Sequence, residues 1–119
     1  MGDSVVVTES NGVHVIRFAQ NAILDAATVD RVAADLQAVV AVKEPRRIVL
    51  VLDGVTFLSS RALGVFVALR KTAEESKSTI VFAGVRPELT KVFQLTRLDK
   101  LFRCLPTVEA AIEALAPKG

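Results

Sequence analysis

The segment that decides the fold is RIVLVLD, residues 47–53. Between Arg47 and Asp53 every residue is apolar, so polar and apolar positions do not alternate. An unbroken apolar run of this kind is typical of a strand that lies in the middle of a sheet and is covered on both faces. We therefore expect residues 47–53 to form the central strand of the molecule.

The residues before this strand predict a hairpin and one helix. Residues 5–7 and 13–18 are strand-like, and Asn11-Gly12 between them suits a tight turn between antiparallel strands. After Asp25, which fits an N-cap, apolar residues recur at three- and four-residue spacing, and this indicates an amphipathic helix. Its apolar positions are Val29, Val32, Ala33, Leu36, Val39 and Val40.

The residues after the central strand predict three more helices and two more strands. One helix begins at residues 59–60, the next has Pro87 in its first turn, and the last is capped by Thr107. Residues 79–83 form a short apolar strand, and residues 101–105 are expected to form another.

The predicted order is β-β-α-β-α-β-α-β-α, which indicates a single α/β domain over residues 1–119. Strands that alternate with helices imply a mainly parallel sheet, here of four to five strands, joined by right-handed crossovers. The N-terminal hairpin adds an antiparallel strand, and about four helices cover the sheet. A chain of 119 residues is long enough for one hydrophobic core.

The composition argues against binding of nucleic acid and against insertion into a membrane. The net charge is +2, basic and acidic residues are interspersed, and the chain has no Tyr or Trp for stacking on bases. Charges interrupt every apolar run before it reaches the about 20 residues needed to span a bilayer. The N-terminus lacks the pattern of a signal peptide, and Cys104 is the only cysteine, so we expect a reducing, cytoplasmic location.

The sequence offers no set of residues that would form a catalytic or metal site. With one histidine, His14, and one cysteine, a zinc site made of these residue types is excluded, and no metal or other cofactor is expected. His14 is interpreted as an exposed strand residue, far in sequence from the serines at 59–60. We therefore expect no catalytic residue and no enzyme activity.

Other reactive or polar residues also have ordinary structural interpretations. Cys104 lies between Phe102 and Leu105 and is predicted to be a small buried residue. Gly54 is a single glycine after a strand, without the spaced glycines and lysine of a phosphate-binding loop, and is predicted to form a turn. Asp53 is either a carboxylate of a site or a turn acid.

The most specific stretch is residues 55–64, VTFLSSRALG. It places the hydroxyls of Ser59 and Ser60 where a loop meets the N-terminus of a helix. Free backbone N–H groups and the positive end of the helix dipole lie there, and such a position tolerates a phosphate. The alternative is that one of the two serines only caps the helix.

Three segments resemble the STAS domain of bacterial anti-sigma factor antagonists: LDGVTFL at 52–58, LGV at 63–65 and AGVRP to LTRLDKLF at 83–102. The resemblance implies a regulatory protein that binds an anti-sigma factor with serine-kinase activity and is released by phosphorylation. The phosphoacceptor of the family falls on Ser60. The implied partner-binding residues are Thr56, Phe57, Leu58, Ser59, Ser60, Arg61, Ala62, Leu63 and Val67.

The chain departs from the family pattern around Ser60. Ser59 stands where the family has Asp, Arg61 replaces a second hydroxyl residue, and Ala62 replaces glycine. We expect Arg61 to be able to pair with a phosphate on Ser60. Ala62 favours the helix over glycine by about 1 kcal/mol.

The resemblance also implies a second kind of function, and the residues leave a third open. STAS domains also serve as structural subunits of lipid-transport ABC complexes and of stress-sensing assemblies, where the helix at Ser60 would be a permanent interface. A hydrolase that uses Ser60 ranks behind both binding functions. The sequence leaves the oligomeric state open, a dimer included.

Overall fold

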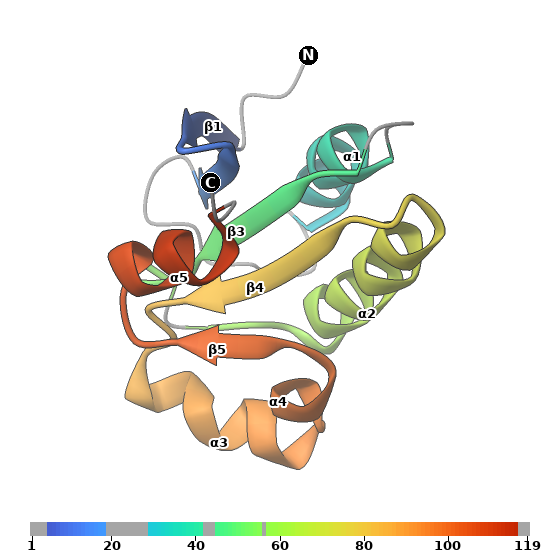
Figure 1. Ribbon diagram of the computed structural model, residues 1–119. Helices are drawn as coiled ribbons and strands as arrows, with labels where there is room; N and C mark the ends of the chain where they lie inside the picture. Colours follow the sequence, from blue (N-terminus) through green and yellow to red (C-terminus); the bar gives the residue numbers. More distant parts are fainter. Residues whose placement is uncertain (1–4, 19–28, 42–44, 56, 117–119) are drawn as a thin grey trace.

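The computed structural model describes residues 5–18, 29–41, 45–55 and 57–116. Its elements in chain order are β1 (Val5–Ser10), β2 (Val13–Phe18), α1 (Val29–Val40), β3 (Arg47–Val51), α2 (Ser60–Glu75), β4 (Thr79–Ala83), α3 (Pro87–Leu95), α4 (Leu98–Leu101), β5 (Arg103–Leu105) and α5 (Val108–Leu115). They form one five-stranded sheet in the order β1-β2-β3-β4-β5 (Figure 1). The hairpin β1-β2 is antiparallel and every other pair is parallel, which confirms the predicted α/β fold.

The N-terminal hairpin turns as the sequence predicts. Asn11 and Gly12 have φ angles of 53° and 79°, and Ser10 pairs with Val13 on either side of them. Two consecutive residues with positive φ are typical of the two-residue turn whose twist matches that of the strands. The hairpin therefore adds β1 to the edge of the sheet beside β2.

Helices cover both faces of the sheet, as the apolar central strand requires. On one face, Ile48 and Leu50 of β3 pack in a core with α1, α2, α3 and α4. On the other, Val49 and Val51 pack in a smaller core with Ala111 of α5 (Figure 1). Because successive strand residues point to opposite faces, the continuous run in β3 serves both cores.

A group of phenylalanines fixes α2 and α3 against β4. The ring of Phe82 is fully buried, and its centroid lies 5.2 Å from that of Phe66, 5.3 Å from that of Phe93 and 4.6 Å from that of Phe102. Aromatic rings at these separations pack favourably beyond the area that they bury. Phe82 therefore holds the first half of α2 in a fixed position on the sheet.

The structure differs from the prediction after α3. The predicted strand at 101–105 is shorter, and the one-turn helix α4 precedes it, so the fold has five helices in the described residues. Arg97 takes a left-handed conformation with φ 63°, which ends α3, and its carbonyl then accepts the N–H of Lys100 at 3.1 Å. The predicted N-cap of the first helix, Asp25, lies outside the described residues.

Candidate functional site

The loop from β3 to α2 is anchored at both ends. Leu52 donates its N–H to the carbonyl of Ala83 at 2.9 Å, and Val55 donates its N–H to the carbonyl of Leu52 at 3.0 Å across the turn that contains Gly54. Val55 and Leu58 are buried in the core, whereas the side chain of Phe57 between them is 50% exposed. The loop therefore presents Phe57 to solvent directly before α2.

Ser59 is the N-cap of α2. Its φ and ψ of −71° and 162° are extended, and its Oγ accepts the N–H of Ala62 at 3.1 Å. Its carbonyl accepts the N–H of Leu63 at 3.1 Å, the first hydrogen bond of the helix. Both contacts are those of a capping serine. The sequence left open whether one of the two serines caps the helix, and in the structure Ser59 is that residue.

Ser60 is the first residue of α2, and its side chain is exposed. Its hydroxyl makes no hydrogen bond with any residue in the described part of the chain. The first N–H groups of a helix lack acceptors within the helix, and the dipole is positive at this end. A free hydroxyl therefore lies beside groups that favour an anion.

Arg61 is held by a residue of another helix. Its Nη2 lies 2.6 Å from Oδ1 of Asp30 in the first turn of α1. Both side chains are largely exposed, at 61% and 67%, so the pair contributes little to stability. It does place the guanidinium toward α1, and Asp30 has to be displaced before Arg61 can give all of its donors to a neighbouring phosphate.

The predicted partner-binding residues divide into a surface group and a supporting group. Phe57, Ser60, Arg61 and Val67 are exposed, and Ser59 and Leu63 are partly exposed. Leu58 and Ala62, in contrast, are 8% and 1% exposed and belong to the core. In this conformation these two residues support the surface group from beneath, and their contact with a partner stays a prediction. Thr56 lies outside the described residues.

The exposed stripe of α2 also contains two residues that the sequence analysis missed. Ser60, Gly64, Val67 and Lys71 follow at steps of four, three and four, and all are exposed. A Cβ built at Gly64 would meet nothing within 4 Å, so the backbone of the helix is open to solvent there. The helical spacing from Ser60 was the signal that could have identified Gly64 and Lys71.

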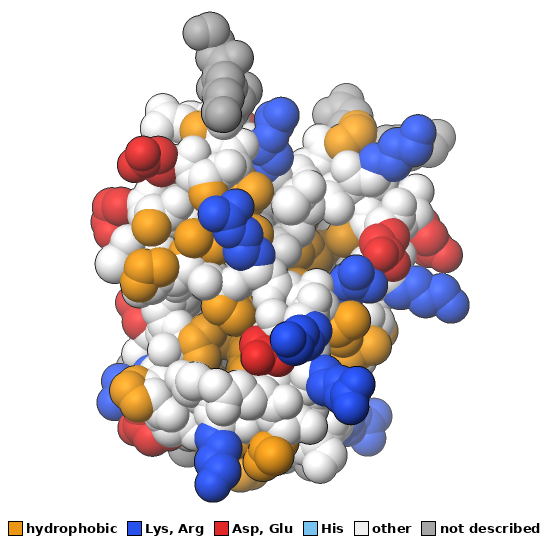
Figure 2. Space-filling model, turned by 60° about the horizontal axis from the view of Figure 1, so that its bottom comes forward, with side chains coloured by type: hydrophobic (Ala, Val, Ile, Leu, Met, Phe, Trp, Pro, Cys, Tyr) orange, Lys and Arg blue, Asp and Glu red, His pale blue; other side chains and the backbone are white. Residues whose placement is uncertain are grey.

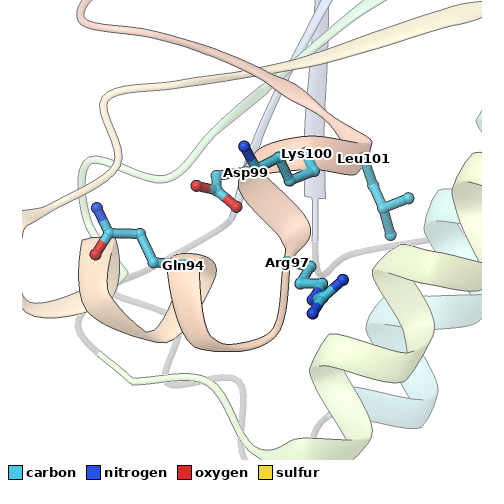
Figure 3. A pocket seen from close by; sticks show the side chains of 5 residues that line it. All are labelled: Gln94, Arg97, Asp99, Lys100 and Leu101. Atoms are coloured by element: carbon cyan, nitrogen blue, oxygen red, sulfur yellow. The ribbon is translucent and has the colours of Figure 1, made fainter.

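Helix α4 lies against the side of α2. Nε of Arg70 donates to the carbonyl of Leu101 at 2.8 Å, and its Nη1 lies 3.1 Å from Oε2 of Glu74. Arg70 therefore joins α2 to α4. Beside α4 an open cavity of about 600 Å³ is lined by Gln94, Arg97, Asp99, Lys100 and Leu101 (Figure 3).

Asp53 is a turn acid at the carboxyl end of the parallel strands. Its Oδ2 lies 3.9 Å from Nη1 of Arg17, and its carbonyl accepts from Nη1 of Arg86 at 3.3 Å. Gly84 has φ 68°, and a Cβ there would lie 3.1 Å from Cβ of Asp53. The loops after β3 and β4 therefore pack closely at this edge of the sheet.

Glu88 is stabilised as a carboxylate in the first turn of α3. Its own backbone N–H and the guanidinium of Arg86 both donate to the carboxylate and hold the pKa of Glu88 below its ordinary value. Nη2 of Arg86 lies 3.3 Å from Oε2 of Glu88. This pair belongs to the start of α3 and involves neither serine.

His14 and Cys104 differ from their predicted environments. His14 is half-buried rather than exposed, and its Nδ1 is buried without a hydrogen-bond partner in the described chain. Cys104 is exposed rather than buried, because β5 is a short strand at the edge of the sheet. Partial burial of the thiol, with the negative charge of Asp99, nevertheless raises the pKa of Cys104, so the thiol is less reactive than usual.

In the described residues, no group of three or more His, Cys, Asp and Glu side chains is placed to hold a metal ion. Among the described helices, none has the length and apolar character needed to cross a membrane.

Comparison with known proteins agrees with the fold. A solved anti-sigma-factor antagonist (STAS) domain protein from Planctomyces limnophilus has a TM-score of 0.85 at 25% identity, over 95% of this chain and 98% of that one. An anti-sigma factor antagonist from Mycobacterium paratuberculosis has a TM-score of 0.75 at 26% identity, over 95% and 93%.

The chain also matches a known protein and a family model by sequence. A STAS-domain containing protein of Pseudomonas aeruginosa (strain UCBPP-PA14) is 36% identical over 59 residues, which are 50% of this chain and 58% of that protein. The match thus spans little more than half the length of this curated relative. The family model of the STAS domain matches residues 4–111, nearly the whole chain. The chain therefore belongs to the STAS domain family.

Proposed function

We propose that the chain is a protein-binding regulator, an anti-sigma factor antagonist that binds an anti-sigma factor with serine-kinase activity. In this proposal, phosphorylation of Ser60 releases the partner. The observation that carries the proposal is the division of roles between the two serines: Ser59 caps α2, and the hydroxyl of Ser60 is exposed and unbonded in the described chain. A kinase can reach such a hydroxyl without breaking the helix cap.

The surface around Ser60 supports a protein contact. Phe57 is 50% exposed and Val67 46% exposed, and both lie close to Ser60 in sequence, one on the loop and one on the solvent face of α2. Aromatic and apolar side chains at the centre of a surface patch are typical anchors of protein interfaces. Gly64 between them leaves room for a partner to approach the backbone of the helix.

The charges around Ser60 support release by phosphorylation. A phosphate brings about −1.5 to −2 charges, and its burial in an apolar interface is costly unless a cation meets it. The nearest cation in sequence, Arg61, is already paired with Asp30 at 2.6 Å. A partner that packs on Phe57 and Val67 would therefore have to desolvate the phosphate.

The similar structures support the same class of function. The proteins from Planctomyces limnophilus and Mycobacterium paratuberculosis are anti-sigma factor antagonists, and each is matched over at least nine-tenths of its length. On this basis we propose a binding module without catalytic activity, in the cytoplasm, where sigma factors act.

The test is affinity capture of the tagged domain from its own cells, followed by mass spectrometry of the captured proteins and of the peptide that contains Ser60. We expect an anti-sigma factor with a kinase domain, and a fraction of Ser60 phosphorylated. Recovery of transporter or scaffold subunits with unmodified Ser60 would contradict the proposal and indicate a structural STAS subunit.

The switch itself is tested by titration of the captured partner with two variants. Ser60→Asp places a negative charge in the contact and is expected to weaken binding at least tenfold, since burial of a charge without a partner costs several kcal/mol. Ser60→Ala adds no charge and is the matched control, expected to bind as the wild type does. Equal affinity of all three proteins would contradict a switch at Ser60.

A further inference from the structure

Arg97 occupies a backbone conformation that its side chain disfavours. Its φ and ψ are 63° and 18°, in the left-handed region that glycine adopts at little cost. The turn is made by the backbone, because the N–H of Arg97 donates to the carbonyl of Gln94 and its carbonyl accepts from the N–H of Lys100. A glycine would make the same turn with less strain, so the turn itself does not require the Arg97 side chain.

The guanidinium of Arg97 has no structural role in the described chain. The side chain is exposed and makes no hydrogen bond or ion pair with any described residue, and the same holds for Lys100. Both line the cavity beside α4, together with Gln94 (Figure 3). Asp99 is the one carboxylate among the lining residues, so the wall has more positive than negative groups.

One wall of this cavity is α4, which lies beside α2. The hydrogen bond from Arg70 to the carbonyl of Leu101 holds α4 against α2. Leu95, at the end of α3, is 74% exposed, the largest fraction among the exposed large hydrophobic residues in the described chain. In Figure 2, where the part of the molecule with α3 and α4 comes forward, basic side chains gather beside exposed hydrophobic ones.

We infer that the cavity at Arg97 receives an acidic side chain of the partner protein, an aspartate or glutamate next to an apolar residue that packs on Leu95. The inference rests on the proposed function, because the partner is the same protein. A carboxylate can accept two parallel hydrogen bonds from a guanidinium and a further one from an ammonium, which matches Arg97 and Lys100. The excess of positive groups favours a carboxylate despite Asp99.

The test compares Arg97→Gly with Lys77→Gly. Lys77 is an exposed cation with φ 60° just beyond the C-terminal end of α2, which is the end opposite Ser60. Its replacement by glycine removes the same charge and the same kind of backbone strain as Arg97→Gly does. Both variants are expected to unfold at a higher temperature than the wild type. The probe is the purified partner recovered by capture with the wild-type domain.

We expect Arg97→Gly to bind the partner about tenfold more weakly or worse, and Lys77→Gly to bind as the wild type does. The affinity of the wild type should also fall more steeply with added salt than that of Arg97→Gly. A more stable variant that binds less well cannot owe its loss to misfolding. Lys100→Ala provides a second variant in the same cavity and is expected to weaken binding in the same direction.

The outcomes separate this inference from the proposed function. If Ser60→Asp weakens binding but Arg97→Gly and Lys100→Ala do not, the acidic contact is overturned and the Ser60 surface stands. If Arg97→Gly weakens binding but Ser60→Asp does not, the acidic contact is supported and the switch is contradicted. Titration with inorganic phosphate is the last check, because saturable shifts of the Arg97 and Lys100 amide signals at low millimolar phosphate would overturn the inference in favour of a phosphate site.

Discussion

The different roles of Ser59 and Ser60 can be tested on the isolated domain. Ser59→Ala removes the Oγ that accepts the N–H of Ala62 at 3.1 Å, whereas Ser60→Ala removes a hydroxyl that has no acceptor or donor in the described chain. Loss of a capping serine typically costs about 1 kcal/mol. We therefore expect Ser59→Ala to lower the free energy of unfolding by about 1 kcal/mol and Ser60→Ala to leave it unchanged within about 0.5 kcal/mol.

The expected change in melting temperature follows from the size of the chain. At about 2.1 cal/mol/K per residue, a chain of 119 residues has an entropy of unfolding of roughly 0.25 kcal/mol/K. A loss of about 1 kcal/mol therefore lowers the melting temperature by about 4 °C. Ala is a slightly better helix former than Ser, so Ser60→Ala should melt at the same temperature or slightly above it.

The assay is thermal and urea unfolding of the wild type and three variants, followed by circular dichroism. Ser59→Asp is the matched control, since aspartate caps a helix as well as serine does and its charge suits the positive end of the dipole. It should melt no lower than the wild type. A loss for Ser60→Ala as large as that for Ser59→Ala would refute the argument, because the Ser60 hydroxyl would then be engaged rather than free for a kinase.

Three further predictions concern the scaffold. Phe82→Ala should lower the free energy of unfolding in urea by about 3–5 kcal/mol, because the ring is fully buried among three others. Leu95→Ala, at an exposed site, should change it by less than about 0.5 kcal/mol. Similar losses for the two variants would contradict the core described above. In the same urea unfolding experiment, Gly84→Ala should lower the free energy of unfolding by roughly 1–2 kcal/mol, since φ is 68° and the new Cβ would lie 3.1 Å from Cβ of Asp53. Gly64→Ala, where the helix is open to solvent, should raise it by up to about 1 kcal/mol. A more stable Gly84→Ala and a less stable Gly64→Ala would contradict this account of the two glycines. The pKa of Glu88 is lowered in the folded state, so its carboxylate stabilises the fold above the ordinary glutamate pKa, and this contribution is lost as the pH falls through the lowered value. The difference in melting temperature between the wild type and Glu88→Gln should therefore shrink from about pH 7 to about pH 3. A difference that stays constant over this range would count against the lowered pKa.

The sequence predicts the regular parts of the fold because their patterns are local. The apolar run at 47–53 and the three- and four-residue spacing of α1 depend on neighbours along the chain, and both elements occur where predicted. Helix α4 has a single turn, too short for a periodic pattern, and it forms because Arg97 takes a left-handed conformation. Cys104 was predicted from its apolar neighbours, which do not reveal that β5 lies at the edge of the sheet.

The candidate site was predictable in position but not in its contacts. Two serines before an amphipathic helix indicate a helix start, yet either hydroxyl can cap, and only the geometry assigns the cap to Ser59. The pair between Arg61 and Asp30 joins residues of two helices, and no local pattern connects exposed side chains so far apart in sequence. The same is true of the hydrogen bond from Arg70 to Leu101.

These contacts bear on where a phosphate at Ser60 would act. In the isolated domain, the first turn of α2 offers a phosphate free N–H groups and the positive end of the dipole, so modification should not unfold the helix. In a complex, the same phosphate would lie beside Phe57 and Val67 and would lose water on binding of an apolar partner surface. The cost therefore falls on the complex rather than on the fold, and a switch at Ser60 should change affinity while the domain keeps its stability.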